Sequence, residues 1–266
     1  MVISELIIGT VSALAGGWIY VRSKRTKLYV ELAGRVEEIT NGDRFEFNWA
    51  VHAVPSLGDR IAVVSNFLPE QRFAVLRAAI HQILGCERSF VPMHKKGGTI
   101  AYETLITTAP AIVAFYHSAS LTEFISCVVG ARVYPTPLND QSSLSMLFYD
   151  RPGDHIGWHF DRNFYCGRHF TLLLAMLNEG HSDGGLSHAI LKTQAGPHEV
   201  DVRTPANTLV IFEGAEVRHR VTPILDDERR IMLSMTFCTD PRAHRWQGAS
   251  RRVKDMAFFG IRPLWT

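Results

Sequence analysis

The sequence predicts a mainly β fold with flanking helices, in the form of a sandwich, jelly roll or barrel that follows an apolar N-terminal helix. Three observations support this fold class. After Gly130, short alternating stretches follow one another, separated by clusters of Gly, Pro, Asp and Asn. Before that point, two longer stretches carry apolar residues at helical spacing. Finally, a hydrophobic fraction of 46% over 266 residues is sufficient for one sizeable core.

The expected strands share β-branched, aromatic and aliphatic residues in short runs with turn residues between most of them. They are residues 143–150, 155–161, 168–177, 188–193, 198–202, 208–214, 218–224 and 229–237. Two helices are expected ahead of them. Pro69 opens a segment with helical spacing up to Ile83, and a second helix is expected at 110–129, interrupted near His117 and Ser118.

The N-terminal segment 2–21 is apolar apart from Glu5, and the basic segment 22–27 follows it directly. About 20 apolar residues form a helix that spans the hydrocarbon core of a membrane. A signal peptide carries its positive charges ahead of the apolar segment, so an uncleaved, single-pass membrane anchor is the preferred interpretation. The basic flank then places the remaining chain on the cytoplasmic side. The alternative is a buried or interfacial helix, because several glycines lower the hydrophobicity of the segment.

The expected domain organisation has three parts. These are the anchor with its basic flank at 1–27, a connector at 28–60, and one domain at 61–266 with its β core at about 130–240 and a tail at 241–266. The tail is basic and aromatic, and we expect it to fold back as a helix over the barrel. The net charge of +2 indicates no nucleic-acid partner. The four cysteines are widely separated, which excludes a zinc ribbon and a compact disulfide framework.

The candidate chemistry lies at His159 and Asp161, because residues two apart on a strand point to the same face. An imidazole and a carboxylate from one strand supply two ligands to a divalent metal. His219, which follows a Gly214 turn, is the candidate third ligand from another strand. Two histidines and one carboxylate form the arrangement with which non-haem Fe(II) oxygenases leave positions open for a cosubstrate and dioxygen. The sequence therefore predicts that His159, Asp161 and His219 are both the metal ligands and the catalytic residues.

A cation is expected at the start of the last strand, where Arg229 and Arg230 lie side by side. A dicarboxylate that chelates a metal through its 2-oxo acid end leaves a distal carboxylate, which a guanidinium matches in bidentate geometry. Strand parity favours Arg230, because Ser234 and Thr236 share its face if that face is the barrel interior. Arg229 would then be a surface neighbour.

Four segments in order resemble the Fe(II)/2-oxoglutarate-dependent dioxygenases, specifically the prolyl-4-hydroxylase-like branch. They are YDRPGDHIGWHFD, GGLSHAIL, NTLVIFEG and HRVTPILDDERR. The resemblance extends over about residues 63–240. Two further stretches, DRPGDHIGWHFDRNFYCGRHFTLLL and LSMTFCTDP, are similar to the subgroup that includes amino-acid hydroxylases and radical halogenases.

The resemblance implies a double-stranded β-helix, or jelly-roll, core. It also implies Fe(II) as the metal, 2-oxoglutarate and dioxygen as cosubstrates, and ascorbate as an accessory reductant. The family's usual interval from the distal histidine points to Arg229, in contrast to strand parity. Tyr149 matches the family's tyrosine and could donate its hydroxyl to the same carboxylate, although an amphipathic core tyrosine is the alternative.

The resemblance also bears on the reaction. In the halogenases of this subgroup a small residue replaces the carboxylate ligand, whereas this chain has Asp161. Hydroxylation of an unactivated C–H bond, or a related oxidation such as desaturation, is therefore expected. The expected substrate is a small molecule such as an amino acid or a membrane-associated metabolite. Two alternatives are a prolyl-type protein hydroxylase and a non-catalytic jelly-roll domain that binds a ligand.

Overall fold

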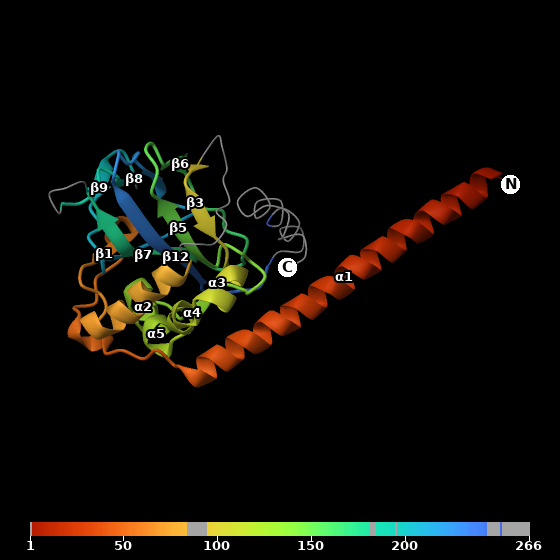
Figure 1. Ribbon diagram of the computed structural model, residues 1–266, viewed down its shortest axis with the longest axis horizontal. Coiled ribbons are helices and arrows are strands. Elements are labelled where there is room, and N and C mark those ends of the chain that lie inside the picture. Colours follow the sequence, from red (N-terminus) through yellow and green to blue (C-terminus); the bar gives the residue numbers. More distant parts are fainter. Residues whose placement is uncertain (1, 84–94, 181–184, 195, 244–250, 252–266) are drawn as a thin grey trace.

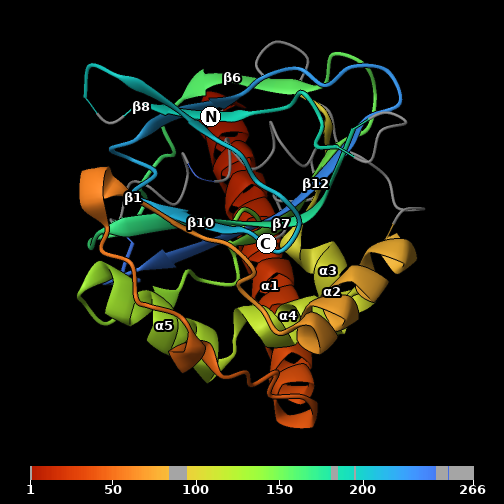
Figure 2. The same ribbon diagram turned by 90° about the vertical axis from the view of Figure 1, so that its left-hand side faces the viewer.

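The computed structural model describes residues 2–83, 95–180, 185–194, 196–243 and 251, with the backbone alone for 2–19, 59, 81 and 82. Its strands form two sheets that face each other, and helices lie on the outer side of one of them (Figure 1, Figure 2). The helices are α1 (Val2–Gly42), α2 (Glu70–Ile83), α3 (Tyr102–Thr108), α4 (Pro110–Tyr116) and α5 (Ala119–Val129), with 3-10 turns at Trp49–Val51 and Gly58–Arg60.

The described residues form a seven-stranded and a five-stranded sheet, and the paired strands are antiparallel. The larger sheet has the order β1 (Ile61–Val64), β10 (Leu209–Phe212), β7 (His169–Glu179), β12 (Arg229–Cys238), β5 (Leu144–Tyr149) and β3 (Gly98–Ile100), with β4 (Tyr134–Pro135) paired to β12. The smaller sheet has the order β2 (Lys95–Lys96), β6 (His155–His159), β11 (Arg218–Val221), β8 (Leu191–Gln194) and β9 (Glu199–Val202).

From β5 to β12 the chain passes repeatedly from one sheet to the other, as it does in a jelly roll. The strands expected from residue 143 onwards are these eight, β5 to β12, so the predicted β core is confirmed. The predicted helices are confirmed as α2 and as the α4–α5 pair, which breaks at His117 and Ser118 as expected. Strands β1 to β4 and helix α3 were not predicted, because they are short and are stabilised by pairing or packing with distant residues.

Alternation along the central strands divides the core into two layers. Leu172, Leu174 and Met176 of β7 pack with the helices in one cluster, whereas Leu173 and Ala175 belong to a second cluster together with residues of the smaller sheet. Successive side chains of a strand point to opposite faces, so β7 is apolar on both. The second cluster borders the space between the sheets.

Helix α1 continues through the segment expected to be a connector, and this is a correction to the sequence-based prediction. Leu28, Leu32, Val36 and Ile39 recur at helical spacing and pack on the helix layer of the domain. Glu31 and Arg35 add an i,i+4 ion pair at 3.2 Å. The turn signal at Asn41–Gly42 marks the end of this helix, which runs away from the domain toward the N-terminus (Figure 1).

Among the residues whose side chains the structure describes, which do not include 2–19, no single helix has the length and hydrophobicity needed to cross a membrane. The bent pair α4 and α5 meets this criterion by length and composition alone, and most of its apolar side chains are buried in the domain core. The tail expected at 241–266 lies outside the described residues except for 241–243 and Arg251.

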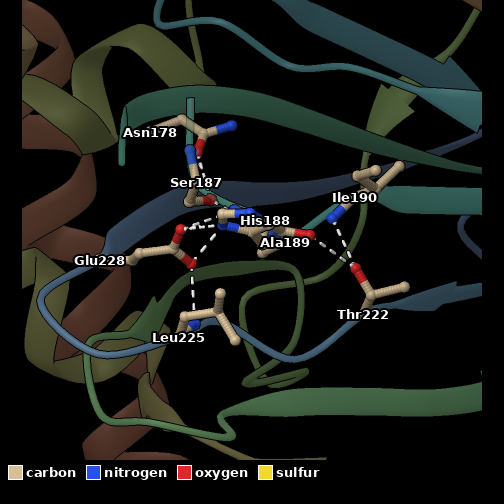
Figure 3. A network of polar contacts seen from close by, with 8 residues as sticks. All are labelled: Asn178, Ser187, His188, Ala189, Ile190, Thr222, Leu225 and Glu228. Carbon is tan, nitrogen blue, oxygen red and sulfur yellow. Dashed lines mark hydrogen bonds and ion pairs between the residues drawn. The ribbon is translucent and has the colours of Figure 1, made fainter. Parts of the chain in front are cut away.

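A buried carboxylate, Glu228, ties the β11–β12 connection to the segment that precedes β8 (Figure 3). It accepts hydrogen bonds from the backbone N–H of His188 at 3.0 Å and of Leu225 at 2.7 Å, and the His188 imidazole forms an ion pair with it. The hydroxyl of Thr222 donates to the carbonyl of His188 at 3.0 Å. Burial would raise the pKa of Glu228, but the bonds from His188 and Leu225 lower it below its ordinary value.

We predict that Glu228→Gln lowers the free energy of unfolding by about 1.5–3 kcal/mol near neutral pH, the usual contribution of hydrogen bonds to a charged group. Because the folded-state pKa is lowered, the carboxylate's contribution is complete above the ordinary value of 4.5 and is lost as the pH falls through the folded-state pKa. Urea unfolding of wild type and variant at several pH values measures this. The difference in unfolding free energy between wild type and Glu228→Gln should become smaller as the pH falls below the ordinary pKa of 4.5.

The control for this prediction is Glu216→Gln, since Glu216 is an exposed glutamate whose ion pair is with Arg60 at 2.6 Å. Exposed pairs contribute about 0–1 kcal/mol, so this variant should unfold nearly as wild type does. A Glu228→Gln effect of the same size at all pH values would contradict a role for the negative charge.

Candidate metal centre

His159, Asp161 and His219 come together in the structure with one donor atom each, all within 4.8 Å of one another. The Nε2 atoms of His159 and His219 lie 3.7 and 3.8 Å from Oδ1 of Asp161. The pairing of β6 with β11 places the two histidines directly opposite each other, with ring centroids 4.0 Å apart. Two imidazole nitrogens and a carboxylate oxygen in this arrangement could hold an iron ion on one face and leave its other positions open.

The two imidazole rings are oriented by their own strands. Nδ1 of His159 lies 2.8 Å from the carbonyl oxygen of Gly157, and Nδ1 of His219 lies 3.0 Å from that of Val217. A carbonyl can only accept, so each Nδ1 carries a proton, and in the neutral ring Nε2 is then the nitrogen with the lone pair. Hydrogen bonds of this kind fix the tautomer of a metal-binding histidine. The rings are therefore prepared to bind a cation through Nε2.

Asp161 lies two residues beyond the end of its strand, because β6 ends at His159. Its position is held by a backbone hydrogen bond from its N–H to the carbonyl of Gly214 at 2.8 Å and by the Thr171 hydroxyl, which donates to Oδ2 at 2.5 Å. Burial would raise the pKa of Asp161, but His219, His159 and the Thr171 hydrogen bond lower it below its ordinary value. The carboxylate is thus ionised at neutral pH and able to bind a cation.

A second charged group, Arg230, is 1% exposed and lines the same cavity. It forms no ion pair with any acidic residue that the structure describes, and its Nε has no hydrogen-bond partner among those residues. Its guanidinium lies 5.4 Å from the ring centre of Tyr149, the residue paired with it across β5 and β12. A buried cation of this kind requires an anion, which a bound ligand can supply.

The Tyr149 hydroxyl is also buried without a hydrogen-bond partner among the described residues. Burial raises the pKa of Tyr149 to about 12, against the opposing effect of the Arg230 charge. The hydroxyl therefore keeps its proton and can donate it in a hydrogen bond. Two adjacent donors that lack acceptors fit a carboxylate ligand.

The structure separates the two candidate arginines. Arg230, Met232, Ser234 and Thr236 all line the cavity, as strand parity predicts. Arg229 has the opposite parity and is exposed. The family's usual spacing after His219 favoured Arg229, but this spacing depends on the length of the β11–β12 connection. Alternation along β12 instead determines which side chains point into the barrel.

The cavity between the two sheets has a volume of about 260 Å³. Apolar side chains line much of it, including Leu147, Ile156, Leu173, Leu191 and Val221. Polar residues complete the lining: Lys95, Thr99, Asp140, Ser142, Ser145, Arg162, His169 and Thr171. The site thus combines a metal-binding cluster and a buried cation within one partly apolar cavity, the usual composition of a small-molecule site.

Three polar residues in the loop after Asp161 have partners within the protein. Asn163 donates to the carbonyl of Gly167 at 2.8 Å, Tyr165 donates to Asp140 at 2.7 Å, and Arg168 pairs with Glu213 at 2.6 Å. These bonds shape the loop after Asp161. Strand alternation predicts that Phe160 faces away from His159 and Asp161 and packs, but this is wrong, because its side chain is 55% exposed and lines the cavity.

Sequence reasoning missed Thr171, Lys95 and His169 as residues of the site. Thr171 and His169 lie at alternate positions of β7, and both line the cavity. Their parity was available from the sequence, but nothing in the sequence identifies the inner face of that strand, because both faces are apolar. Lys95 lies on β2, a two-residue strand that forms only by pairing with β6.

Comparison with solved structures shows the same fold in 2-oxoglutarate-dependent oxygenases. A 2OG-Fe(II) oxygenase family oxidoreductase from Burkholderia pseudomallei is 12% identical, with a TM-score of 0.54 over 70% of this chain and 88% of that one. A prolyl-4-hydroxylase from Pseudomonas putida is 20% identical, with a TM-score of 0.50 over 69% and 94%. The epimerase SnoN from nogalamycin biosynthesis, in complex with Fe3+, alpha-ketoglutarate and nogalamycin RO, is 13% identical, with a TM-score of 0.53 over 68% and 79%. No curated protein sequence matches the chain.

These solved structures share the fold of the chain, which is the fold implied by the resemblance to the Fe(II)/2-oxoglutarate-dependent dioxygenases. A family model described as HalD, halogenase D, matches residues 57–256. The chain belongs to this family.

We predict that His219→Ala abolishes tight binding of Fe(II), or of Co(II) as its oxygen-stable substitute, because one of the three donors is lost. The affinity for the metal should fall by more than about 100-fold, which is the largest loss usually seen when a residue that hydrogen-bonds to a metal ligand is removed. Anaerobic calorimetric titration measures it. His155→Ala is the matched control, since His155 lies in the same β6 strand and its ring contacts the Gly153 carbonyl at 2.8 Å. Equal affinities in the two variants would exclude His219 as a ligand.

Proposed function

We propose that the protein is an Fe(II)- and 2-oxoglutarate-dependent hydroxylase that acts on an unactivated C–H bond of a small molecule. The observation that carries this proposal is the position of the Asp161 carboxylate beside two histidines in a cavity that also buries Arg230, a cation with no acidic partner among the described residues. Iron, when bound there, would supply an oxidation in which 2-oxoglutarate, dioxygen and the substrate C–H group give succinate, CO2 and a C–OH group, with one oxygen atom of dioxygen in succinate and the other in the product.

In this proposal the smaller sheet and the loop after it bind the metal, and the larger sheet binds the cosubstrate. His159 and His219 present Nε2, and Asp161 presents Oδ1, from the smaller sheet and the loop that follows it. Arg230 and Tyr149 of the larger sheet bind the distal carboxylate of 2-oxoglutarate, with the guanidinium as the counter-charge and the hydroxyl as a second donor. The apolar lining excludes water and so strengthens both interactions.

The presence of Asp161 favours hydroxylation over halogenation, although the matching family model is described as a halogenase. A halide ligand would need the position that this carboxylate occupies. The Asp161 side chain is also fitted closely to its surroundings, because a Cβ on Gly214 would lie 2.5 Å from Oδ2. The space between Gly214 and Thr171 is therefore filled by the Asp161 carboxylate.

A small-molecule substrate is favoured over a protein side chain by the size of the cavity, about 260 Å³, and by its position between two sheets. A prolyl-type protein hydroxylase remains the second candidate, since a prolyl-4-hydroxylase shares the fold. Asp140, Ser142 and Arg162 are polar residues of the cavity lining, and we infer that a polar substrate would contact them. A non-catalytic ligand-binding domain is the third candidate, and it would need neither an ionised Asp161 nor iron.

The test of the proposed function is succinate formation from 2-oxoglutarate, measured with and without Fe(II), in the presence of a library of small polar metabolites. We expect iron-dependent succinate and a substrate gaining one oxygen atom. Asp161→Gly should lose hydroxylation by at least about 100-fold, because a ligand is removed. Hydroxylation by Asp161→Gly at the wild-type rate would contradict the metal-site assignment, and chlorinated product from wild type would contradict the reaction type.

A second prediction concerns Arg230, which we expect to bind the distal carboxylate. Arg230→Gln should weaken 2-oxoglutarate binding by at least about 30-fold, since losing one partner of a buried charge pair costs about 2–5 kcal/mol. Calorimetry with the Co(II)-loaded protein measures the affinity. Arg229→Gln, at the adjacent exposed position, should bind as wild type does. The reverse order of the two variants would assign the cosubstrate to Arg229.

We further propose that the chain is anchored to a membrane by its N-terminal segment, with the catalytic domain on the cytoplasmic side. The proposal rests on the apolar residues 2–21 and the basic residues 22–27 that follow them. Carbonate washing of membranes from cells that produce the full chain tests it. Recovery of the protein in the wash would contradict the anchor, whereas Leu14→Arg should shift the protein out of the membrane fraction.

A further inference from the structure

The carboxylate of Asp161 has two oxygens in different surroundings. Oδ1 lies closest to the two imidazole Nε2 atoms, at 3.7 and 3.8 Å, whereas Oδ2 accepts the hydrogen bond of Thr171 at 2.5 Å. A carboxylate can bind a metal through one oxygen or through both. Here Oδ1 faces the two imidazole nitrogens, whereas Oδ2 accepts a hydrogen bond from the protein.

Thr171 holds its hydroxyl in a rigid position. It is 4% exposed and lies on β7, which is paired on both sides, with Phe212 of β10 and Thr236 of β12 as its register partners. A β-branched side chain on a strand has few rotamers, so the direction of its hydroxyl is limited by the backbone. The donor to Asp161 thus comes from one of the most constrained strands of the domain.

Gly214 closes the same small space from the other side. A Cβ at this position would lie 2.5 Å from Oδ2 of Asp161, 2.6 Å from Oγ1 of Thr171 and 2.7 Å from Cβ of Asp161. The Gly214 carbonyl also accepts the backbone N–H of Asp161 at 2.8 Å. Any side chain at 214 would push the carboxylate away from Thr171, so the three residues form one packed unit.

We propose that Thr171 is a positioning residue that binds Oδ2 of Asp161 and thereby leaves Oδ1 as the one oxygen that ligates the metal. This inference rests on the proposed function. Without the Thr171 hydroxyl, the carboxylate is free to turn and to present both oxygens to the metal, or to leave it. If both oxygens of Asp161 bound the metal, the second would occupy a coordination position that a cosubstrate needs. The Thr171 hydroxyl would therefore keep that position open and also maintain the affinity for the metal.

The test compares Co(II) binding and the Co(II) absorption spectrum in the full-length wild type, Thr171→Val and Thr171→Ser. Valine matches the shape of threonine without its hydroxyl, and serine keeps the hydroxyl. We expect Thr171→Val to bind Co(II) about 10- to 100-fold more weakly, which is the usual loss when a hydrogen bond to a metal ligand is removed. We also expect its Co(II) absorption spectrum to differ from that of wild type. We expect Thr171→Ser to bind within about threefold of wild type, because the hydrogen bond is retained.

The control is Thr208→Val, which removes a buried threonine hydroxyl that has no partner among the described residues. It should bind Co(II) as wild type does, which separates the Asp161 contact from the general effect of a buried Thr→Val change. Thr171→Ala repeats the measurement without the valine methyl group, should Thr171→Val not fold. Melting temperatures of the metal-free proteins show whether each variant is folded.

The outcomes separate this inference from the proposed function. Wild-type affinity and an unchanged spectrum in Thr171→Val or Thr171→Ala, with tight binding by wild type, would overturn the role of Thr171 alone. Equal losses in Thr171→Ser and Thr171→Val would also overturn it, since the hydroxyl would then be irrelevant. A wild-type chain that binds no Co(II) would overturn the proposed metal centre and this inference together.

Discussion

The constraint on which this structure depends is the burial of charged groups between two apolar sheets. A charge in such a place is stable only with a partner, because its hydration is lost. Asp161 has partners within the protein, namely His159, His219 and Thr171. Arg230 has no acidic partner among the described residues, so its counter-charge has to come from a ligand. In the proposed function this counter-charge is the distal carboxylate of the cosubstrate, and an arginine buried in this way without it would cost stability, as functional sites commonly do.

The jelly roll places these charges by assigning them to different sheets. The two histidines belong to the smaller sheet, while Thr171, Tyr149 and Arg230 belong to the larger one. The packing of one sheet on the other thus sets the separation between the metal-binding cluster and the buried cation. The Glu228 network supports the same arrangement, because it restrains the connection that leads from His219 to Arg230 (Figure 3). Thr171 and Gly214 then orient the Asp161 carboxylate locally.

Predictions from the sequence succeeded where local pattern dominates and failed where distant pairing does. The strands β5 to β12 and the break between α4 and α5 follow from alternation, helical spacing and turn residues. Helix α1 was missed over 28–42, because its apolar spacing was interpreted as a set of short alternating runs. The two-residue strands β2 and β4 could not be predicted, since they exist only through pairing with β6 and β12. Phe160 was assigned to a packing face although the strand ends at His159, which leaves that ring largely exposed.

The sequence by itself determined the kind of chemistry, because the identities and order of His159, Asp161 and His219 specify a donor set, and strand parity assigns Arg230 to the barrel interior. Only the tertiary structure decided that the three donors lie within 4.8 Å, that Arg230 is buried without an acidic partner among the described residues, and that Thr171 binds one oxygen of Asp161. The physical reason is that residue type and alternation are local properties of a strand. Distances between strands depend instead on sheet pairing and packing, which bring together residues that are far apart in the chain.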